Sequence, residues 1–178
     1  MMGAFAAMRR RFLAASVGLL CCTTPLGAQE LPEYQIKAAF LYNFIAFTEW
    51  PALLGNSIQL CVYGTNPFGE HLNKLQGKGV AQRSLTVRHT GSANELQNCQ
   101  IVFVTREVIS NLSRVIDQLG EKPALLVAEF PGATRQGAML NFVVEEGRVQ
   151  FEVNVRTAEA KGLSFSSKML RLAKEVYR

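Results

Sequence analysis

The sequence has 178 residues, 48% of them hydrophobic, with 19 lysines and arginines against 14 acidic residues. Residues 1–28 contain three of the arginines and no acid, so the remaining 150 residues carry a net charge near +2. This small charge, without a Lys/Arg stripe interleaved with aromatics, argues against nucleic-acid binding, and the length suits one domain.

The N-terminus has the three parts of a cleavable export signal. The basic stretch Arg9–Arg11 precedes an apolar run over Phe12–Cys22, and the small residues Gly27 and Ala28 follow where signal peptidase needs them. The apolar run has 11 residues, far short of the roughly 20 that span a bilayer. We therefore expect a signal peptide over 1–28 and a single periplasmic domain over 29–178.

The first part of that domain alternates helical and strand-like segments. Glu33–Trp50 lacks glycine and proline and is followed by Pro51, which predicts a helix over this range. Apolar runs typical of strands follow at Ile58–Tyr63, Ser84–His89, Gln100–Thr105 and Ala124–Phe130. Two helices are expected between them, one opened by Asn66 and Pro67 and running to about Gln76, the other capped by Ser110 over Asn111–Leu119.

The last part predicts a hairpin and two helices. Ala138–Val144 and Arg148–Val153 alternate apolar and polar residues around Glu145-Glu146-Gly147, as hairpin strands do. Helices are expected at Thr157–Lys161 and Ser166–Tyr177. The whole order predicts a single layered α/β domain, with a mainly parallel sheet of about six strands, a C-terminal antiparallel hairpin and flanking helices.

Residues that carry catalysis or bind metals are sparse. His71 and His89 are the only histidines and neither has a metal-binding spacing, and no serine has the surroundings of a hydrolase nucleophile. We therefore expect no enzyme, no metal site and no cofactor. Glu152 lies on the polar side of its strand, and we expect Lys168 or Arg156 to pair with it if a helix covers that side.

The predicted helix over Glu33–Trp50 is apolar on two sides. Leu41 lies on one side, whereas Phe40 and Phe47 lie nearly opposite the apolar side that contains it. One sheet cannot bury both sides. Either the C-terminal helix covers the second side, or an aromatic patch around Phe40, Tyr42 and Phe47 binds another protein or a second copy in a homodimer.

A second candidate site lies where the predicted strands end. Open α/β sheets bind ligands at the carboxyl ends of their strands, and Gly64, Asn66, Thr105 and Glu129 stand at such ends. A deep pocket there would favour a receptor for a small ligand. A broad apolar surface around the first helix would favour a protein partner instead.

Cys61 and Cys99 are the only cysteines after residue 28. A pair of cysteines in an exported chain suggests a disulfide. Such a bridge would close a loop of about 39 residues. Two buried free thiols on strands are the alternative.

Five segments together resemble the YfiR family of periplasmic proteins. The matching segments, in chain order, are KAAFLYNFIAFTEWP at 37–51, LCVYGTNPFG at 60–69, CQIVFVT at 99–105, GAMLNFVVEEGRVQFEVNV at 137–155 and GLSFSSKMLRLAK at 162–174. The likeness covers nearly the whole mature chain in the same order, which is more specific than any single motif.

The resemblance implies a non-enzymatic repressor. YfiR-like proteins bind the periplasmic sensor domain of an inner-membrane diguanylate cyclase and hold it inactive, which lowers cyclic di-GMP and biofilm formation. An OmpA-like outer-membrane lipoprotein can sequester the repressor. The resemblance also supports pairing Cys61 with Cys99. A second cysteine pair of the family falls at Thr134 and Asn141 here, so redox control through that bridge is not expected to carry over.

We predict that the exported protein is cut after Ala28, because the basic, apolar and small-residue regions all have the required order. N-terminal sequencing of the protein recovered from the periplasmic fraction should therefore begin at Gln29. Recovery of a chain that still starts at Met1 or Met8 would contradict the prediction.

Overall fold

The computed structural model describes residues 33–51 and 55–178, so the predicted signal peptide over 1–28 lies outside the described residues. The α-helices are α1 (Glu33–Ala46), α2 (Leu112–Leu119), α3 (Val155–Glu159) and α4 (Ser167–Leu170). The strands are β1 (Thr48–Glu49), β2 (Ser57–Tyr63), β3 (Gly79–Val80), β4 (Arg83–Thr90), β5 (Ile101–Val104), β6 (Leu125–Ala128), β7 (Leu140–Glu145), β8 (Arg148–Asn154), β9 (Ser164–Phe165) and β10 (Glu175–Tyr177). Short 3-10 turns are η1 (Gly69–His71), η2 (Asn73–Leu75), η3 (Ala93–Asn98), η4 (Arg106–Asn111) and η5 (Ala133–Gln136).

The described strands form one large sheet and one small ladder. The large sheet has eight strands in the order β10-β8-β7-β6-β5-β2-β4-β3, and β1 pairs with β9. Strands β4, β2, β5, β6 and β7 are parallel neighbours, whereas β7 and β8 form an antiparallel hairpin. The predicted α/β class, the mainly parallel sheet and the C-terminal hairpin are confirmed. In the large sheet, the two strands beyond the expected six are the short edge strands β3 and β10, and the β1–β9 ladder was not expected.

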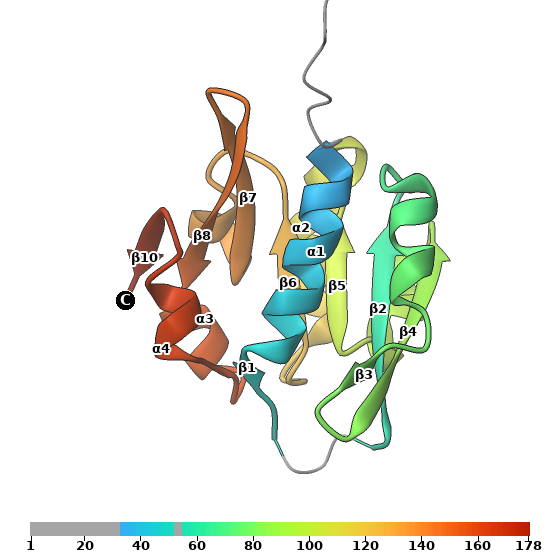
Figure 1. The fold of residues 1–178 in the computed structure, drawn as a ribbon. Helices are drawn as coiled ribbons and strands as arrows, with labels where there is room; N and C mark the ends of the chain where they lie inside the picture. Colours follow the sequence, from blue (N-terminus) through green and yellow to red (C-terminus); the bar gives the residue numbers. More distant parts are fainter. Residues whose placement is uncertain (1–32, 52–54) are drawn as a thin grey trace, which may run out of the picture.

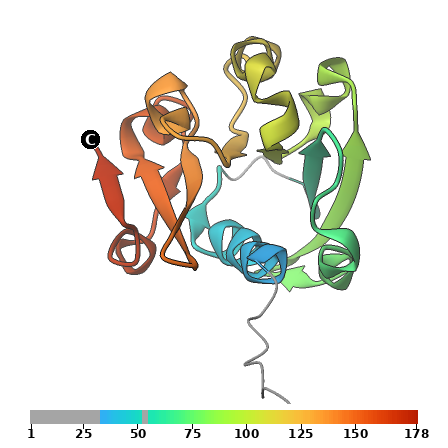
Figure 2. The same ribbon diagram turned by 90° about the horizontal axis from the view of Figure 1, so that it is seen from above.

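The sheet curls around α1, which lies on its concave side, while α2 lies on the convex side (Figures 1 and 2). Ala38, Leu41, Phe44 and Ile45 of α1 are buried in the concave-side core. Fully burying one such large apolar side chain contributes about 1.5–3 kcal/mol. Because the sheet curls around the helix, more than one side of α1 meets apolar residues (Figure 2).

The first helix is shorter than predicted, because side chains cap its C-terminal end at Ala46. The hydroxyl of Thr48 donates to the carbonyl of Phe44 at 2.6 Å, and the Trp50 indole donates to the carbonyl of Ile45 at 3.0 Å. These bonds satisfy carbonyls that a continuing helix would otherwise use. The chain can then extend into β1, whose Thr48 pairs with Phe165 of β9.

The helix predicted from Asn66 to Gln76 is wrong, because the structure has two separate 3-10 turns, η1 and η2, in its place. The side chain of Asn66 accepts a hydrogen bond from the amide of Phe68 at 2.9 Å, which stabilises a local turn. Gly69 then has a φ of +51°, a left-handed conformation that interrupts a helix.

The C-terminal helix is also much shorter than predicted. Ser166 caps α4, since its hydroxyl accepts from the amide of Met169, but α4 ends at Leu170. The remaining chain forms β10 in parallel with β8, with Val176 opposite Val153. Pairing with the otherwise open edge of β8 therefore outweighs the helical preference of this segment.

The disulfide between Cys61 and Cys99 is confirmed. Cys61 lies on β2 and Cys99 directly precedes the neighbouring strand β5, which places their Cα atoms 5.9 Å apart. Both cysteines are buried in the convex-side core, which also contains the inner face of α2. The bridge therefore joins two adjacent central strands within an apolar layer.

We predict that the double substitution Cys61→Ala/Cys99→Ala lowers the free energy of unfolding by about 2–4 kcal/mol, because the unfolded chain then loses its covalent loop. Urea unfolding of the oxidised protein and of the variant measures the difference. A reducing agent should destabilise the unmodified protein and leave the double variant unchanged. An unmodified protein that is insensitive to reduction would contradict the bridge.

Candidate functional site

The carboxyl edge of the sheet has its switch point at β2. From β2 the chain moves to β4 on one side and then to β5 on the other. Ligands of open α/β sheets commonly bind at such a point. Here Gly64 follows β2 with a φ of +103°, and a Cβ atom on it would lie 2.2 Å from the hydroxyl oxygen of Thr105, which follows β5. The backbone at Gly64 thus packs directly against Thr105.

The four residues predicted for a small ligand differ in their surroundings. Thr105 is 3% exposed, and its hydroxyl has no hydrogen-bond partner within the described chain. Asn66 shapes its own turn, and Glu129 is bonded to side chains of α1. None of four cavities found in the described part of the chain is lined by Gly64, Asn66, Thr105 or Glu129. Their ligand-binding role stays a prediction.

A buried ion pair lies at the same edge and was not predicted. Lys37 of α1 is fully buried, and its Nζ lies 2.6 Å from a carboxylate oxygen of Glu129, which follows β6. Lys37 also pairs with Glu33 one turn earlier in the helix. The hydroxyl of Tyr34 donates to the second Glu129 oxygen at 2.9 Å. These contacts tie the first turns of α1 to the end of a central strand.

The sequence does contain a signal for this pair. Lys37 is spaced four and seven residues from Leu41 and Phe44, so it shares their buried side of the helix. A lysine on the inward side needs a buried acid, and Glu129 directly follows the apolar strand β6. The two positions could therefore have been matched before the structure was known.

Tyr34 completes the cluster. Burial first, and then the nearby Glu129 carboxylate, raise the pKa of Tyr34 from its ordinary value of 10.0 to about 12. The hydroxyl therefore stays protonated and remains a donor to Glu129 at neutral pH. Because the raised pKa favours the protonated folded state, this contribution to stability is complete below pH 10.0 and is lost as the pH rises towards about 12.

Away from the ion pair, α1 presents an uncharged face to solvent. Ala39, Asn43 and Ala46 are exposed there, and Phe40, Tyr42 and Phe47 are half-buried at its borders. We call these six residues the α1 outer face. In Figure 1 α1 lies in front of the sheet, and no other helix of the described chain lies over it. The structure therefore places the three predicted aromatic residues around an open face of α1.

Each bordering aromatic side chain is held by the fold. The Phe40 ring lies 5.6 Å from the ring of Phe151, centroid to centroid, in the concave-side core. The Tyr42 hydroxyl donates to the carbonyl of Gly79 at 2.9 Å, and the Lys168 ammonium lies 5.3 Å from the ring centroid of Phe47. These rings combine partial exposure with fixed positions. Whether they bind a partner stays a prediction at this point.

Within the described residues, no cluster of three or more histidine, cysteine, aspartate or glutamate side chains is suited to hold a metal ion. Nor does that part of the chain contain a helix with the length and apolar character needed to cross a membrane.

Comparison with known protein families shows to which family the chain belongs. A family described as YfiR/HmsC-like matches residues 34–174, which includes all of the elements from α1 to the loop before β10. The chain belongs to the YfiR/HmsC-like family. Membership supports a periplasmic location for the chain. No functionally curated protein matches the chain.

Two solved structures resemble the fold. A conserved domain protein from Vibrio cholerae has a TM-score of 0.55 at 11% identity, with 83% of this chain and 61% of that chain covered. The ABC domain in complex with L-Trp from Streptococcus pneumonia has a TM-score of 0.53 at 11% identity, with 80% and 60% covered. The chain thus spans about three fifths of the length of each, and at this identity the likeness shows the fold alone.

Thr134 and Asn141, where the resemblance placed a second cysteine pair, are linked through a carboxylate here. The hydroxyl of Thr134 and the amide nitrogen of Asn141 both donate to the same carboxylate oxygen of Glu152, at 3.1 Å each. The expected pairing of Glu152 with Lys168 or Arg156 is therefore wrong, because the turn η5 supplies a neutral donor and both basic side chains make other contacts. In this protein, the Glu152 carboxylate joins Thr134 and Asn141.

We predict that Lys37→Met lowers the free energy of unfolding by about 3–5 kcal/mol, because Glu129 is left buried without its cation. The double variant Lys37→Met/Glu129→Leu should recover most of that loss. Urea unfolding of the unmodified protein and of both variants measures the loss and its recovery.

The matched control is Lys161→Met, since Lys161 pairs with the exposed Glu121 and such surface pairs contribute at most about 1 kcal/mol. A double variant as unstable as the single one would show that the cost does not come from an unpaired carboxylate.

Proposed function

We propose that this domain represses an inner-membrane diguanylate cyclase by binding the periplasmic sensor domain of the cyclase through the α1 outer face. Family membership supports the class of partner. The observation that carries the choice of surface is that a solvent-facing side of α1 has no charged residue between Glu33 and Ala46, since Lys37, the other charge in the helix, is buried.

The composition of the α1 outer face fits a protein interface. The centres of such interfaces are depleted in charge and enriched in aromatic residues. Ala39 and Ala46 are small enough to let a partner approach the helix closely, and the half-buried rings of Phe40 and Phe47 supply apolar area at the border. Because contacts within the fold already hold these rings, little side-chain freedom is lost on binding.

The proposal also includes the second partner that the family resemblance implies. An OmpA-like outer-membrane lipoprotein would release the cyclase by occupying the repressor, which raises cyclic di-GMP. Binding at a shared surface is the simplest form of this competition, because one occupied face cannot hold the cyclase. The small-ligand receptor remains the alternative, with Gly64, Asn66, Thr105 and Glu129 as its residues.

We predict that Ala39→Glu abolishes repression while the protein stays folded. Ala39 is exposed, so a glutamate there leaves no cavity, whereas truncating Phe40 would also remove packing against Phe44 and Phe151. An unpaired carboxylate buried at the interface should weaken partner binding by at least roughly thirtyfold, about 2 kcal/mol. Cells that carry this variant should show raised cyclic di-GMP and increased surface attachment, as cells with the gene deleted do.

The matched control is Ser113→Glu, which adds the same charge to an exposed position of α2 on the convex side. It should repress as the unmodified protein does, and both variants should keep the unmodified melting temperature. A folded Ala39→Glu variant that still represses would move the interface away from α1. A gene deletion that leaves cyclic di-GMP unchanged would remove the repressor function itself.

A further inference from the structure

A groove of about 310 Å³ runs along one border of the α1 outer face. Gln35, Tyr42 and Asn43 of α1 line one side, and His71, Lys74 and Lys78 from the segment around η1 and η2 line the other. The buried residues Ala38 and Leu75 also contribute to the lining. The groove therefore continues the outer face through Tyr42 and Asn43 into the region of the two 3-10 turns.

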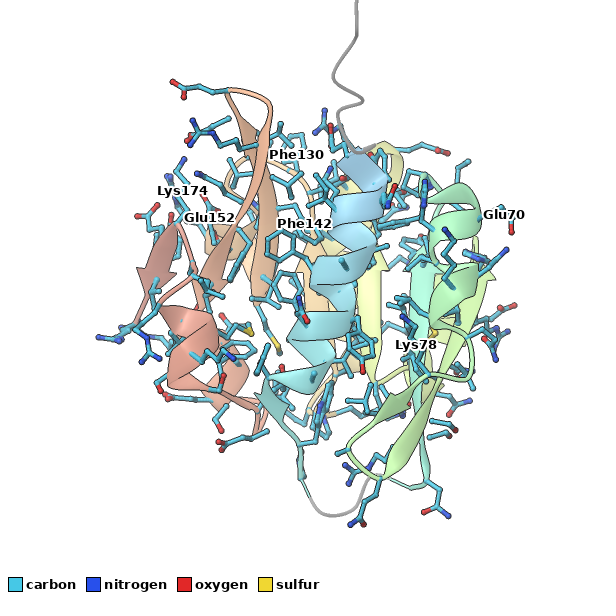
Figure 3. All side chains as sticks on the ribbon, in the orientation of Figure 1. Glu70, Lys78, Phe130, Phe142, Glu152 and Lys174 are labelled. Carbon is cyan, nitrogen blue, oxygen red and sulfur yellow. A yellow bond between two sulfur atoms is a disulfide. The ribbon has the colours of Figure 1, made fainter. Side chains whose placement is uncertain are left out.

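The lining of this groove is basic. It includes Lys74 and Lys78 and no aspartate or glutamate. Within the described residues neither lysine forms an ion pair. The carboxylate of nearby Glu70 accepts a hydrogen bond from Asn73 at 2.5 Å, and Figure 3 shows Glu70 at the outer side of the molecule. No carboxylate of the groove itself offsets the two positive charges.

The positive charge is held in place by the fold. The Lys78 ammonium lies 5.4 Å from the ring centroid of Tyr42, across the groove. The backbone of Lys78 accepts a hydrogen bond from the Leu85 amide of β4 at 2.8 Å. Tyr42 is anchored in turn through its hydrogen bond to Gly79. Both walls of the groove are thus ordered before any occupant binds, which lowers the entropic cost of binding.

We propose that this groove receives an acidic segment of the protein that binds the α1 outer face. The proposal rests on the proposed function, because Ala39, Tyr42 and Asn43 belong both to that face and to the groove. Uncharged contacts on the outer face hold the partner, and the lysines of the groove select carboxylates beside the apolar contact. Charge complementarity of this kind sets partner choice and association rate.

The first test uses no partner protein. A fluorescent oligoglutamate peptide is titrated with the purified mature domain, with an oligoglutamine peptide of the same length as control. The acidic peptide should bind and the neutral one should not, and added salt should weaken binding. The variant Lys74→Glu/Lys78→Glu should bind at least roughly tenfold more weakly.

The control for the peptide test is Arg114→Glu/Arg171→Glu, which changes the net charge equally at two exposed positions outside the groove lining. It should bind the peptide as the unmodified domain does. Equal binding of both peptides, or equal loss in both variants, would overturn the groove as the site. Inorganic phosphate that displaces the peptide at equal concentration would show a site for small anions instead, and would overturn the acidic segment as the occupant.

The second test is made in cells. Lys74→Glu/Lys78→Glu should raise cyclic di-GMP, whereas Arg114→Glu/Arg171→Glu should not, with melting temperatures unchanged in both. Full repression by the groove variant would overturn the proposal even where Ala39→Glu confirms the outer face. A gene deletion without effect on cyclic di-GMP would contradict the proposed function, and the acidic segment of the partner would then be contradicted too. The peptide test would still show separately whether the basic groove binds carboxylates.

Discussion

The buried ion pair between Lys37 and Glu129 sets the orientation of α1, and the orientation of α1 decides what the molecule shows to a partner. A fully buried lysine needs its acid, so α1 cannot rotate about its axis without separating the pair and leaving the Glu129 carboxylate buried without its cation. With Lys37 turned inward, Ala39, Asn43 and Ala46 turn outward. A contact inside the fold thereby determines which residues of α1 face solvent.

The two ends of α1 are fastened by different interactions. The N-terminal end is joined to the sheet by Lys37, Tyr34 and Glu129, and at the other end the chain passes directly into the β1 and β9 ladder. Between these points the curled sheet surrounds the helix on its concave side (Figure 2). The helix is therefore held at both ends and has one solvent-exposed side. A rigid open face suits recognition, because a partner meets the same arrangement each time it binds.

The sequence predicted best those elements that depend on local patterns. The apolar runs of β2, β5 and β6 and the hairpin of β7 and β8 follow from burial on both faces and from alternation. The strands that the sequence did not predict reflect competition between local preference and pairing at a distance. Thr48–Glu49 and Glu175–Tyr177 have no strong strand pattern, and they become strands because β9 and the edge of β8 offer them partners.

The candidate site could likewise be predicted only in part from the sequence. The aromatic residues Phe40, Tyr42 and Phe47 could be selected from helical periodicity, and Gly64 and Thr105 from the ends of strands. Which sides remain open depends on the curl of the sheet, which no local pattern encodes. The groove could not have been expected, because the predicted helix over 66–76 would have placed Lys74 differently from the turn η2 that carries it.

The presence of a single cysteine pair after residue 28 has a consequence for how the protein matures. Four cysteines can be joined in three ways, so a chain with two native bridges can form scrambled isomers that must be reshuffled. Beyond residue 28 this chain has only Cys61 and Cys99. Its oxidation has one possible product and requires an electron acceptor but no isomerase. The link through Glu152 forms and breaks without any change of redox state, as β7 and β8 come together.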